Sequence, residues 1–228
     1  GYKVGSVTGT GQGGGAFPGG GAGDGQYVFQ QSAGQVTVKV AFVWDNPFAD
    51  VFPDDWFYSA LEYVAVNHLM EGTGGNAFQP SQTLNRAMAA QLFYNLEGKP
   101  AVTGDSAFTD VTSGHWAVDA ITWAAQNDIV AGIGGNLYDP DSNVTREQFA
   151  VMLYKYARFK GYDLTATGDL TQFPDAGSIS SWAETALSWA NGNGLINGHE
   201  NGTIDPKGST IRAQAASIMA NFDQNVAK

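Results

Sequence analysis

The sequence predicts a mainly α-helical fold. Three helix–loop–helix copies should form a pseudo-threefold bundle with short central strands at the start of each copy, preceded by a small glycine-rich β segment. Two observations predict this arrangement: a pattern centred on residues 108–156 occurs three times, and apolar residues within each copy recur at helical spacing. A repeated unit of this kind usually cannot bury its apolar face alone, so it packs against its siblings.

The repeated pattern is a set of marker residues in a fixed order. From Trp to Arg the spacing is the same in all copies, and only the Phe-to-Trp loop of the third copy carries one extra residue. We therefore divide the chain into residues 1–43 and three copies at 44–98, 105–160 and 170–225. The markers are Phe48, Asp50, Trp56, Ala60, Asn67, Gly72, Pro80 and Arg86, then Phe108, Asp110, Trp116, Ala120, Asn127, Gly132, Pro140 and Arg146, then Phe173, Asp175, Trp182, Ala186, Asn193, Gly198, Pro206 and Arg212.

Residues 1–43 differ in kind from the repeats. Short runs, of which 36–43 is the last, alternate β-branched and polar residues, and this alternation predicts strands. The glycine-rich stretch 9–25 has high backbone entropy and little to bury, so we expect a mobile loop. The segment resembles the end of an upstream β module. Because so small a sheet is marginal alone, we expect it to dock on the repeats or to pair with a strand of another chain.

The first helix of each copy is predicted to open near the repeated Trp. Apolar residues at spacings of three, four and seven mark one buried face. We expect Trp56, Trp116 and Trp182 to belong to this face rather than to stack on a sugar, because large aromatic residues on such a stripe are mostly core. The helices should end where the next residue adopts a left-handed backbone, at His68, Asp128 and Gly194.

The second helix of each copy is predicted to open at the repeated Arg. Thr145 is expected to cap the middle helix, with Gln148 closing a capping box. Asn85 is also a good cap, whereas Ile211 cannot cap. The leading segments, such as Phe108–Val111, are too short to form a sheet separately. We expect the three to meet around one axis, with six helices outside.

These motifs resemble a known family. The sequence FTDV at 108–111, the helix opened at Trp116, DIVAGIGGNLYDP at 128–140 and VTREQFA at 144–150 are similar to the surface-layer (S-layer) homology domain, usually present as three tandem copies. The resemblance covers roughly residues 44–225. It implies a pseudo-threefold bundle whose repeated Arg lines a glycan-binding groove between copies. The acidic residue that follows this Arg in the family survives only as Glu147, so we favour the groove that uses Arg146.

Composition excludes several classes of partner. The net charge of −11, from 11 basic and 22 acidic residues, argues against general binding to nucleic acid or to an anionic membrane. There is no cysteine and no apolar run long enough to span a bilayer. Because the chain starts at Gly1 rather than Met, we expect a processed or excised segment. The histidines fall at unrelated positions in the repeat and no metal-ligand spacing is present, so we predict no enzyme activity, no metal and no cofactor.

The candidate ligand site is built on the repeated arginines. A guanidinium at a helix start, beside free backbone N–H groups, suits a carboxylate or phosphate. The alternative is that each Arg pairs with a repeated Asp and fastens neighbouring copies together. Asp139, Asp141 and Asn143 could hold calcium, but a turn is the simpler interpretation. The candidate ligand-binding set is Arg86, Arg146, Arg212, Asp50, Asp110, Asp175, Gly74, Gly134 and Thr145.

Two functions remain open. The resemblance implies a non-catalytic, extracellular anchoring module of the cell surface or cell wall that binds anionic, often pyruvylated, secondary cell wall polysaccharide through the grooves. The alternative is a structural subunit of a surface array or filament, a homo-oligomer that assembles through the strands of residues 1–43, because an unpaired strand edge recruits further strands.

Overall fold

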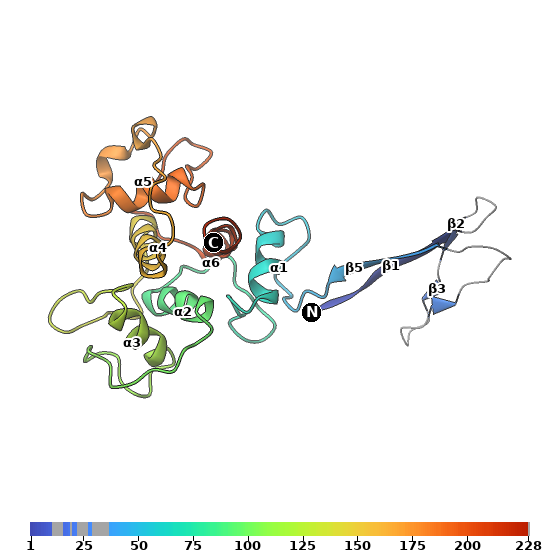
Figure 1. The fold of residues 1–228 in the computed structure, drawn as a ribbon, viewed down its shortest axis with the longest axis horizontal. Helices are drawn as coiled ribbons and strands as arrows, with labels where there is room; N and C mark the ends of the chain where they lie inside the picture. Colours follow the sequence, from blue (N-terminus) through green and yellow to red (C-terminus); the bar gives the residue numbers. More distant parts are fainter. Residues whose placement is uncertain (11–15, 19, 22–26, 29–36, 228) are drawn as a thin grey trace. The chain divides into compact units, whose positions relative to one another are not determined.

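A computed structural model describes residues 1–10, 16–18, 20–21, 27–28 and 37–227 (Figure 1). The chain divides into two units, residues 1–47 and 48–228. In the described part of the chain, no helix is both long and apolar enough to cross a membrane.

The first unit is a β structure. Strand β1 (Tyr2–Thr10) pairs antiparallel with β5 (Thr37–Trp44) on one side and with β2 (Ala16–Pro18) on the other. Strands β3 (Gly20–Gly21) and β4 (Tyr27–Val28) form a second, two-stranded sheet. The strand predicted over 36–43 is thus confirmed by β5.

The expected loop over 9–25 is wrong where β1, β2 and β3 extend into it. The reason is that ladder hydrogen bonds use backbone groups, which glycine supplies as well as any residue. The rest of that stretch lies outside the described residues. Whether the unit docks on the repeats or pairs with another chain stays a prediction.

The second unit is helical, and its packed helix pairs join different copies. In Figure 1 the second helices of the copies, α2, α4 and α6, lie around the centre, and the first helices lie outside them. Each second helix packs on the first helix of the next copy, α2 on α3, α4 on α5 and α6 on α1. The predicted mainly α, pseudo-threefold fold is confirmed. The elements are α1 (Tyr58–Val66), α2 (Arg86–Leu96), α3 (Val118–Gln126), α4 (Arg146–Lys160), η1 (Leu170–Gln172), η2 (Ala176–Ser178), α5 (Glu184–Gly192) and α6 (Arg212–Asn225).

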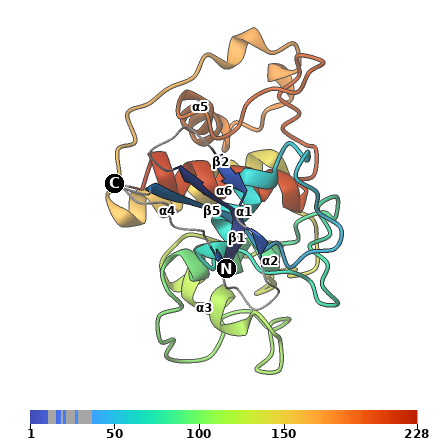
Figure 2. The same cartoon turned by 90° about the vertical axis from the view of Figure 1, so that its right-hand side faces the viewer.

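A closed ring of backbone hydrogen bonds ties the copies together at the axis. The N–H of Leu84 donates to the carbonyl of Thr210 over 2.7 Å, Thr210 donates to Val144 over 2.9 Å, and Val144 donates to Leu84 over 2.9 Å. All three side chains are buried. Figure 2 shows the same helices from a direction 90° away. The second helices therefore start from one shared centre.

The expectation that the leading segments, such as Phe108–Val111, form short strands at this centre is wrong, because they are turns and bends. The segments that meet there are those before the second helices. The aspartates of the leading segments hold the following loop instead. Asp50 accepts from the N–H groups of Phe78 and Gln79 over 2.8 and 2.7 Å, and Asp110 and Asp175 do the same in their own copies. A side chain used in this way fixes a turn rather than a strand.

The repeated tryptophans are exposed, which corrects the expectation that they pack in the core. Trp56, Trp116 and Trp182 expose 69%, 60% and 58% of their surface. Each lies in a turn before its helix, so the helical spacing that places residues on the buried face does not apply to it. The residue that follows each Trp points inward instead, and these residues are Phe57, Ala117 and Ala183.

The predicted helix ends are confirmed. His68, Asp128 and Gly194 have φ angles of 58°, 55° and 68°. Thr145 and Gln148 form the capping box of α4. The side chain of Asn85 accepts from the N–H of Met88 at the start of α2.

The repeated Phe and Gly are explained by one contact. A Cβ atom on Gly72 would lie 2.8 Å from the ring of Phe48 and 2.7 Å from the carbonyl oxygen of Ala77. Gly132 and Phe108 are placed in the same way, as are Gly198 and Phe173. Only a residue without a side chain lets the ring approach so closely.

Candidate functional site

The repeated arginines lie at the seams between copies and are buried. Arg86, Arg146 and Arg212 expose only 7%, 5% and 6% of their surface. Each belongs to the second helix of one copy and reaches into the loop of the next. Arg86 donates from Nε to the carbonyl of Tyr138 over 2.7 Å and from Nη2 to that of Ala131 over 2.6 Å.

The other two arginines repeat this geometry. Arg146 donates to the carbonyls of Ile204 and Asn197 over 2.8 and 2.6 Å. Arg212 donates to those of Phe78 and Glu71 over 2.8 and 2.7 Å, which closes the cycle from the third copy to the first. Arg212 also lies over the ring of Phe78 with its guanidinium carbon 4.5 Å from the centroid. The arginines therefore fasten neighbouring copies, but through carbonyls rather than through the repeated aspartates.

The free helix-start N–H groups expected beside each Arg are already in use. The N–H of Arg86 donates to the carbonyl of Ser142 over 3.0 Å, and that of Ala87 to Pro140 over 2.9 Å. The starts of α4 and α6 bond to the loops of their neighbours in the same way. The expectation of open donors at these positions is wrong, because the loop of the next copy acts as an internal cap.

The charges at the seams act on each other. Burial by itself raises the pKa of Asp50, but the N–H groups of Phe78 and Gln79 and the charge of Arg212 bring that pKa below its usual value. Asp110 follows the same pattern, with Arg86 as the nearby cation. Burial lowers the pKa of Arg212 to about 10, and Asp50 acts in the opposite direction. Asp50, Asp110 and Arg212 are therefore charged at neutral pH.

An open cleft of about 720 Å³ lies beside one of the seams. One wall is the partly buried side of α2 that carries Met88, Gln91 and Asn95, and another is the loop that follows α1. Trp116 of the second copy and Arg212 of the third complete it. The lining residues are Glu71, Gly72, Thr73, Gln79, Gln82, Leu84, Met88, Gln91, Leu92, Asn95, Lys99, Trp116 and Arg212.

The chemistry of this cleft suits a polar ring compound with an acidic group. Gln91 donates to Asn95 over 2.7 Å, and Asn95 donates to the carbonyl of Leu69 over 3.0 Å, so the two amides are held in order along α2. The exposed indole of Trp116 offers a flat apolar face, and Lys99 supplies a positive charge. Amides, an indole and a cation are the groups that recognise hydroxyls, a pyranose face and an anion.

The predicted site residues do not gather in this cleft. Arg212 lines it, and Gly74 follows the lining residue Thr73. Arg86, Arg146, Gly134 and Thr145 are not among its lining residues. At the seam favoured from the sequence, Glu147 is 2% exposed and its carboxylate is bonded to Ser180 and Lys207. Ligand binding by the predicted set stays a prediction.

Sequence reasoning missed Trp116, Gln91, Asn95 and Lys99 as candidates. The sequence did mark Trp116, because a tryptophan stands at the same position in all three copies. Its spacing from the apolar residues of the helix, however, predicted a place in the core. Lys99 has no such signal. Residues Phe159 and Asn225 stand at the same distance from the repeated Arg in the other copies.

The turn interpretation of the Asp139 region matches the structure. Asp139 has a φ of 60° and accepts from the hydroxyl of Ser142 over 2.5 Å. Asn143 accepts from Thr83 of the first copy over 2.8 Å. In the described ranges, no group of three or more His, Cys, Asp or Glu side chains is placed to hold a metal.

Comparison with known proteins assigns the family. The S-layer homology domain matches residues 47–90, 107–150 and 172–216. The chain belongs to the S-layer homology domain family. Each of the three copies is therefore one S-layer homology domain. S-layer homology domains are non-catalytic modules that anchor proteins at the cell surface.

Relatives carry the same region in larger proteins. The chain is similar to an amylopullulanase of Thermoanaerobacterium thermosulfurigenes, 33% identical over 78% of this chain and 10% of the relative. It is similar to a surface-layer 125 kDa protein of Lysinibacillus sphaericus, 32% identical over 73% of this chain and 14% of the relative. It is also similar to a cellulosome-anchoring protein of Acetivibrio thermocellus, 27% identical over 66% of this chain and 34% of the relative. The S-layer homology region is thus a small part of each of these relatives.

Proposed function

We propose that this S-layer homology module acts outside the cell and binds an anionic, in some cases pyruvylated, secondary cell wall polysaccharide through the cleft that the first copy lines together with Trp116 of the second copy and Arg212 of the third. The observation that carries the proposal is the cleft itself, in which Trp116, two ordered amides and a cation face one space. The proposal moves the ligand contacts away from the arginine forks, whose Nε and Nη2 donors bond to carbonyls.

The charge of the protein supports a local rather than a general attraction. A chain of net charge −11 repels an anionic polymer at long range. Binding therefore depends on a site where a cation outweighs the nearby acids. Lys99 and Arg212 against Glu71 give the cleft such a balance.

A binding assay on purified cell walls tests the proposal. The protein should sediment with intact walls and should stay in solution after the acidic polymer has been extracted. Binding that survives the extraction, and does not weaken as salt rises, would contradict the proposal.

A second function, assembly through residues 1–43, is favoured by one observation. Strand β5 pairs with β1, and three side chains on one of its faces, Val38, Val40 and Phe42, are 45%, 46% and 65% exposed. Strand edges and apolar faces of this kind recruit further strands. Replacing Val40 with Lys should then abolish any self-association seen by light scattering, while wall binding persists. A wild-type protein that stays monomeric at high concentration would reject this function.

A further inference from the structure

The positive groups around the three seams are not equivalent. Three of the lysines in residues 48–227 are bonded to carboxylates. Lys155 contacts Asp128 over 3.0 Å, Lys160 contacts Glu97 over 2.8 Å, and Lys207 bonds to Glu147. Lys99 differs, because its Nζ lies 3.7 Å from Glu71, beyond hydrogen-bond distance. Its side chain is 50% exposed and lines the cleft.

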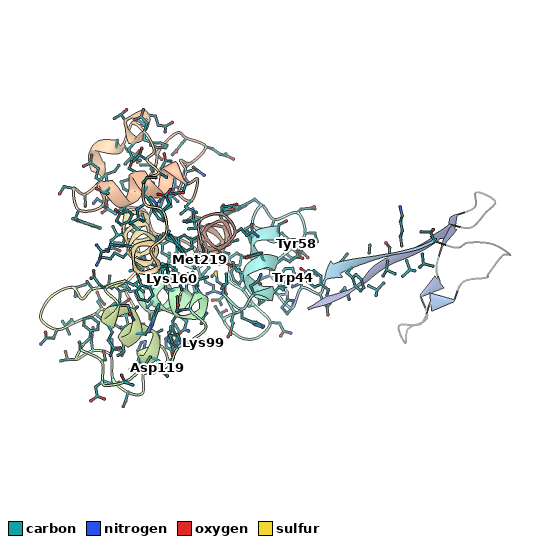
Figure 3. The ribbon with its side chains drawn as sticks, in the orientation of Figure 1. Trp44, Tyr58, Lys99, Asp119, Lys160 and Met219 are labelled. Carbon is teal, nitrogen blue, oxygen red and sulfur yellow. The ribbon has the colours of Figure 1, made fainter. Side chains whose placement is uncertain are left out.

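The backbone presents Lys99 in a fixed position. The N–H of Lys99 donates to the carbonyl of Tyr94 over 2.9 Å, and the hydroxyl of Tyr94 donates to the carbonyl of Pro100 over 2.8 Å. Lys99 also has a φ of 56°, a conformation that costs a non-glycine residue about 1 kcal/mol. The segment after α2 is therefore tied down, and Figure 3 shows Lys99 beside that helix.

Arg212, which lines the same cleft, has a structural role. Arg212 is 6% exposed and binds two carbonyls of the first copy, so it holds one wall of the cleft in place. An incoming anion would have to break these bonds to reach Nε or Nη2. The side chain of Lys99 is half-exposed, and an anion needs to displace only the carboxylate of Glu71, which lies 3.7 Å from Nζ.

We infer that Lys99 is the group that binds the acidic substituent of the glycan, with Trp116 stacking on the adjoining sugar ring and Arg212 only positioning the walls. The inference rests on the proposed polysaccharide binding and makes it specific. It assigns acid recognition to the cleft that Lys99 lines, since Phe159 and Asn225 stand at the same distance from the repeated Arg in the other copies. The acid is a carboxylate or a phosphate, since the oxygens of both accept hydrogen bonds from an ammonium.

The test compares matched lysine variants of the full chain on purified wall polysaccharide. Lys99→Gln should weaken binding to the intact polymer about tenfold, since one charge-assisted bond is lost. Lys99→Arg should restore most of the affinity. Lys207→Gln and Lys155→Gln remove lysines already bonded to carboxylates and should leave the affinity within about twofold.

Two chemically altered polymers identify the acid. Carboxyl reduction should bring the wild-type affinity down to that of Lys99→Gln if the acid is a carboxylate, and removal of phosphate should do so if it is a phosphate. On the polymer that has lost the acid recognised by Lys99, the Lys99→Gln variant and the wild type should bind equally tightly. Trp116→Ala should weaken binding to every polymer, while Trp56→Ala should not.

The outcomes separate the inference from the function on which it rests. A wild-type protein that binds none of the polymers overturns the proposed function, and the inference with it. A wild-type protein that binds, with Lys99→Gln equally tight on the intact polymer, overturns the inference alone. Circular dichroism of the variants should match that of wild type, because Lys99 is exposed.

Discussion

The guanidinium of Arg212 and the backbone carbonyl of Glu71 lie 2.7 Å apart, and this bond fastens the third copy to the first. The chain connects the first copy to the second and the second to the third, but only folding brings the ends of this series together. The contact therefore closes a ring that the covalent chain leaves open. It also explains why an arginine stands at the start of each second helix, where its charge opposes the helix dipole.

Arg212→Ala should reduce the free energy of unfolding by about 3 kcal/mol, because the carbonyls of Phe78 and Glu71 lose a charged donor. Urea denaturation measures this change. Arg158→Ala, on the surface beside Asp128, should cost less than about 1 kcal/mol. Equal effects of the two substitutions would contradict the fastening role. Since Arg212→Ala weakens the fold, a loss of wall binding in that variant would not by itself identify a ligand contact.

Gly72→Ala should destabilise the protein by about 1–3 kcal/mol, because a methyl group would press against Phe48 and the carbonyl of Ala77. Thermal unfolding measures the effect. Gly177→Ala is the matched control, since a Cβ atom there meets no atom within 4 Å. If Gly72→Ala melts at the wild-type temperature, the close approach of the ring is not what selects glycine.

Acid should destabilise the fold through the repeated aspartates. The pKa values of Asp50, Asp110 and Asp175 are lowered in the folded state, so their contribution to stability is fully present above the usual value of about 4. It is lost as pH falls through the lowered values. Asp110→Asn should be less stable than wild type at pH 7, and the difference should shrink by pH 3.

Melting temperatures across that range measure the shrinking difference. Asp141→Asn changes an exposed carboxylate two residues beyond Asp139 in the same loop, and as the control it should follow the wild-type curve. A constant gap between Asp110→Asn and wild type from pH 7 to pH 3 would contradict the assignment.

Glu71→Gln should tighten binding of the acidic polymer by about two- to threefold, because Glu71 is the carboxylate that competes for Lys99. Its backbone carbonyl, which holds Arg212, is unchanged by the substitution. Isothermal titration at low salt measures the effect. In the Lys99→Gln background Glu71→Gln should give a smaller gain, and an equal gain in both backgrounds would show that the two charges act independently.

Much of the fold could be predicted from local sequence. The helix ends at His68 and Asp128 and the cap at Thr145 depend on residues that are neighbours in the chain. The marker residues recur at the same spacing three times, and this repetition predicted three equivalent units around one centre. Local rules failed at Trp116, because one turn separates it from its helix and moves it from the buried face to solvent.

The sequence by itself determined three like copies, their helices and their membership of one family, because these depend on spacing along the chain. Only the tertiary structure decided that Arg212 points inward, that Trp116 points outward and that Lys99 stands over an open cleft. Residues of three copies line that cleft, and which of them face it depends on how helices from different copies pack. The distances between residues of different copies are set when the third copy packs against the first, and the spacing of residues along the chain does not specify this contact.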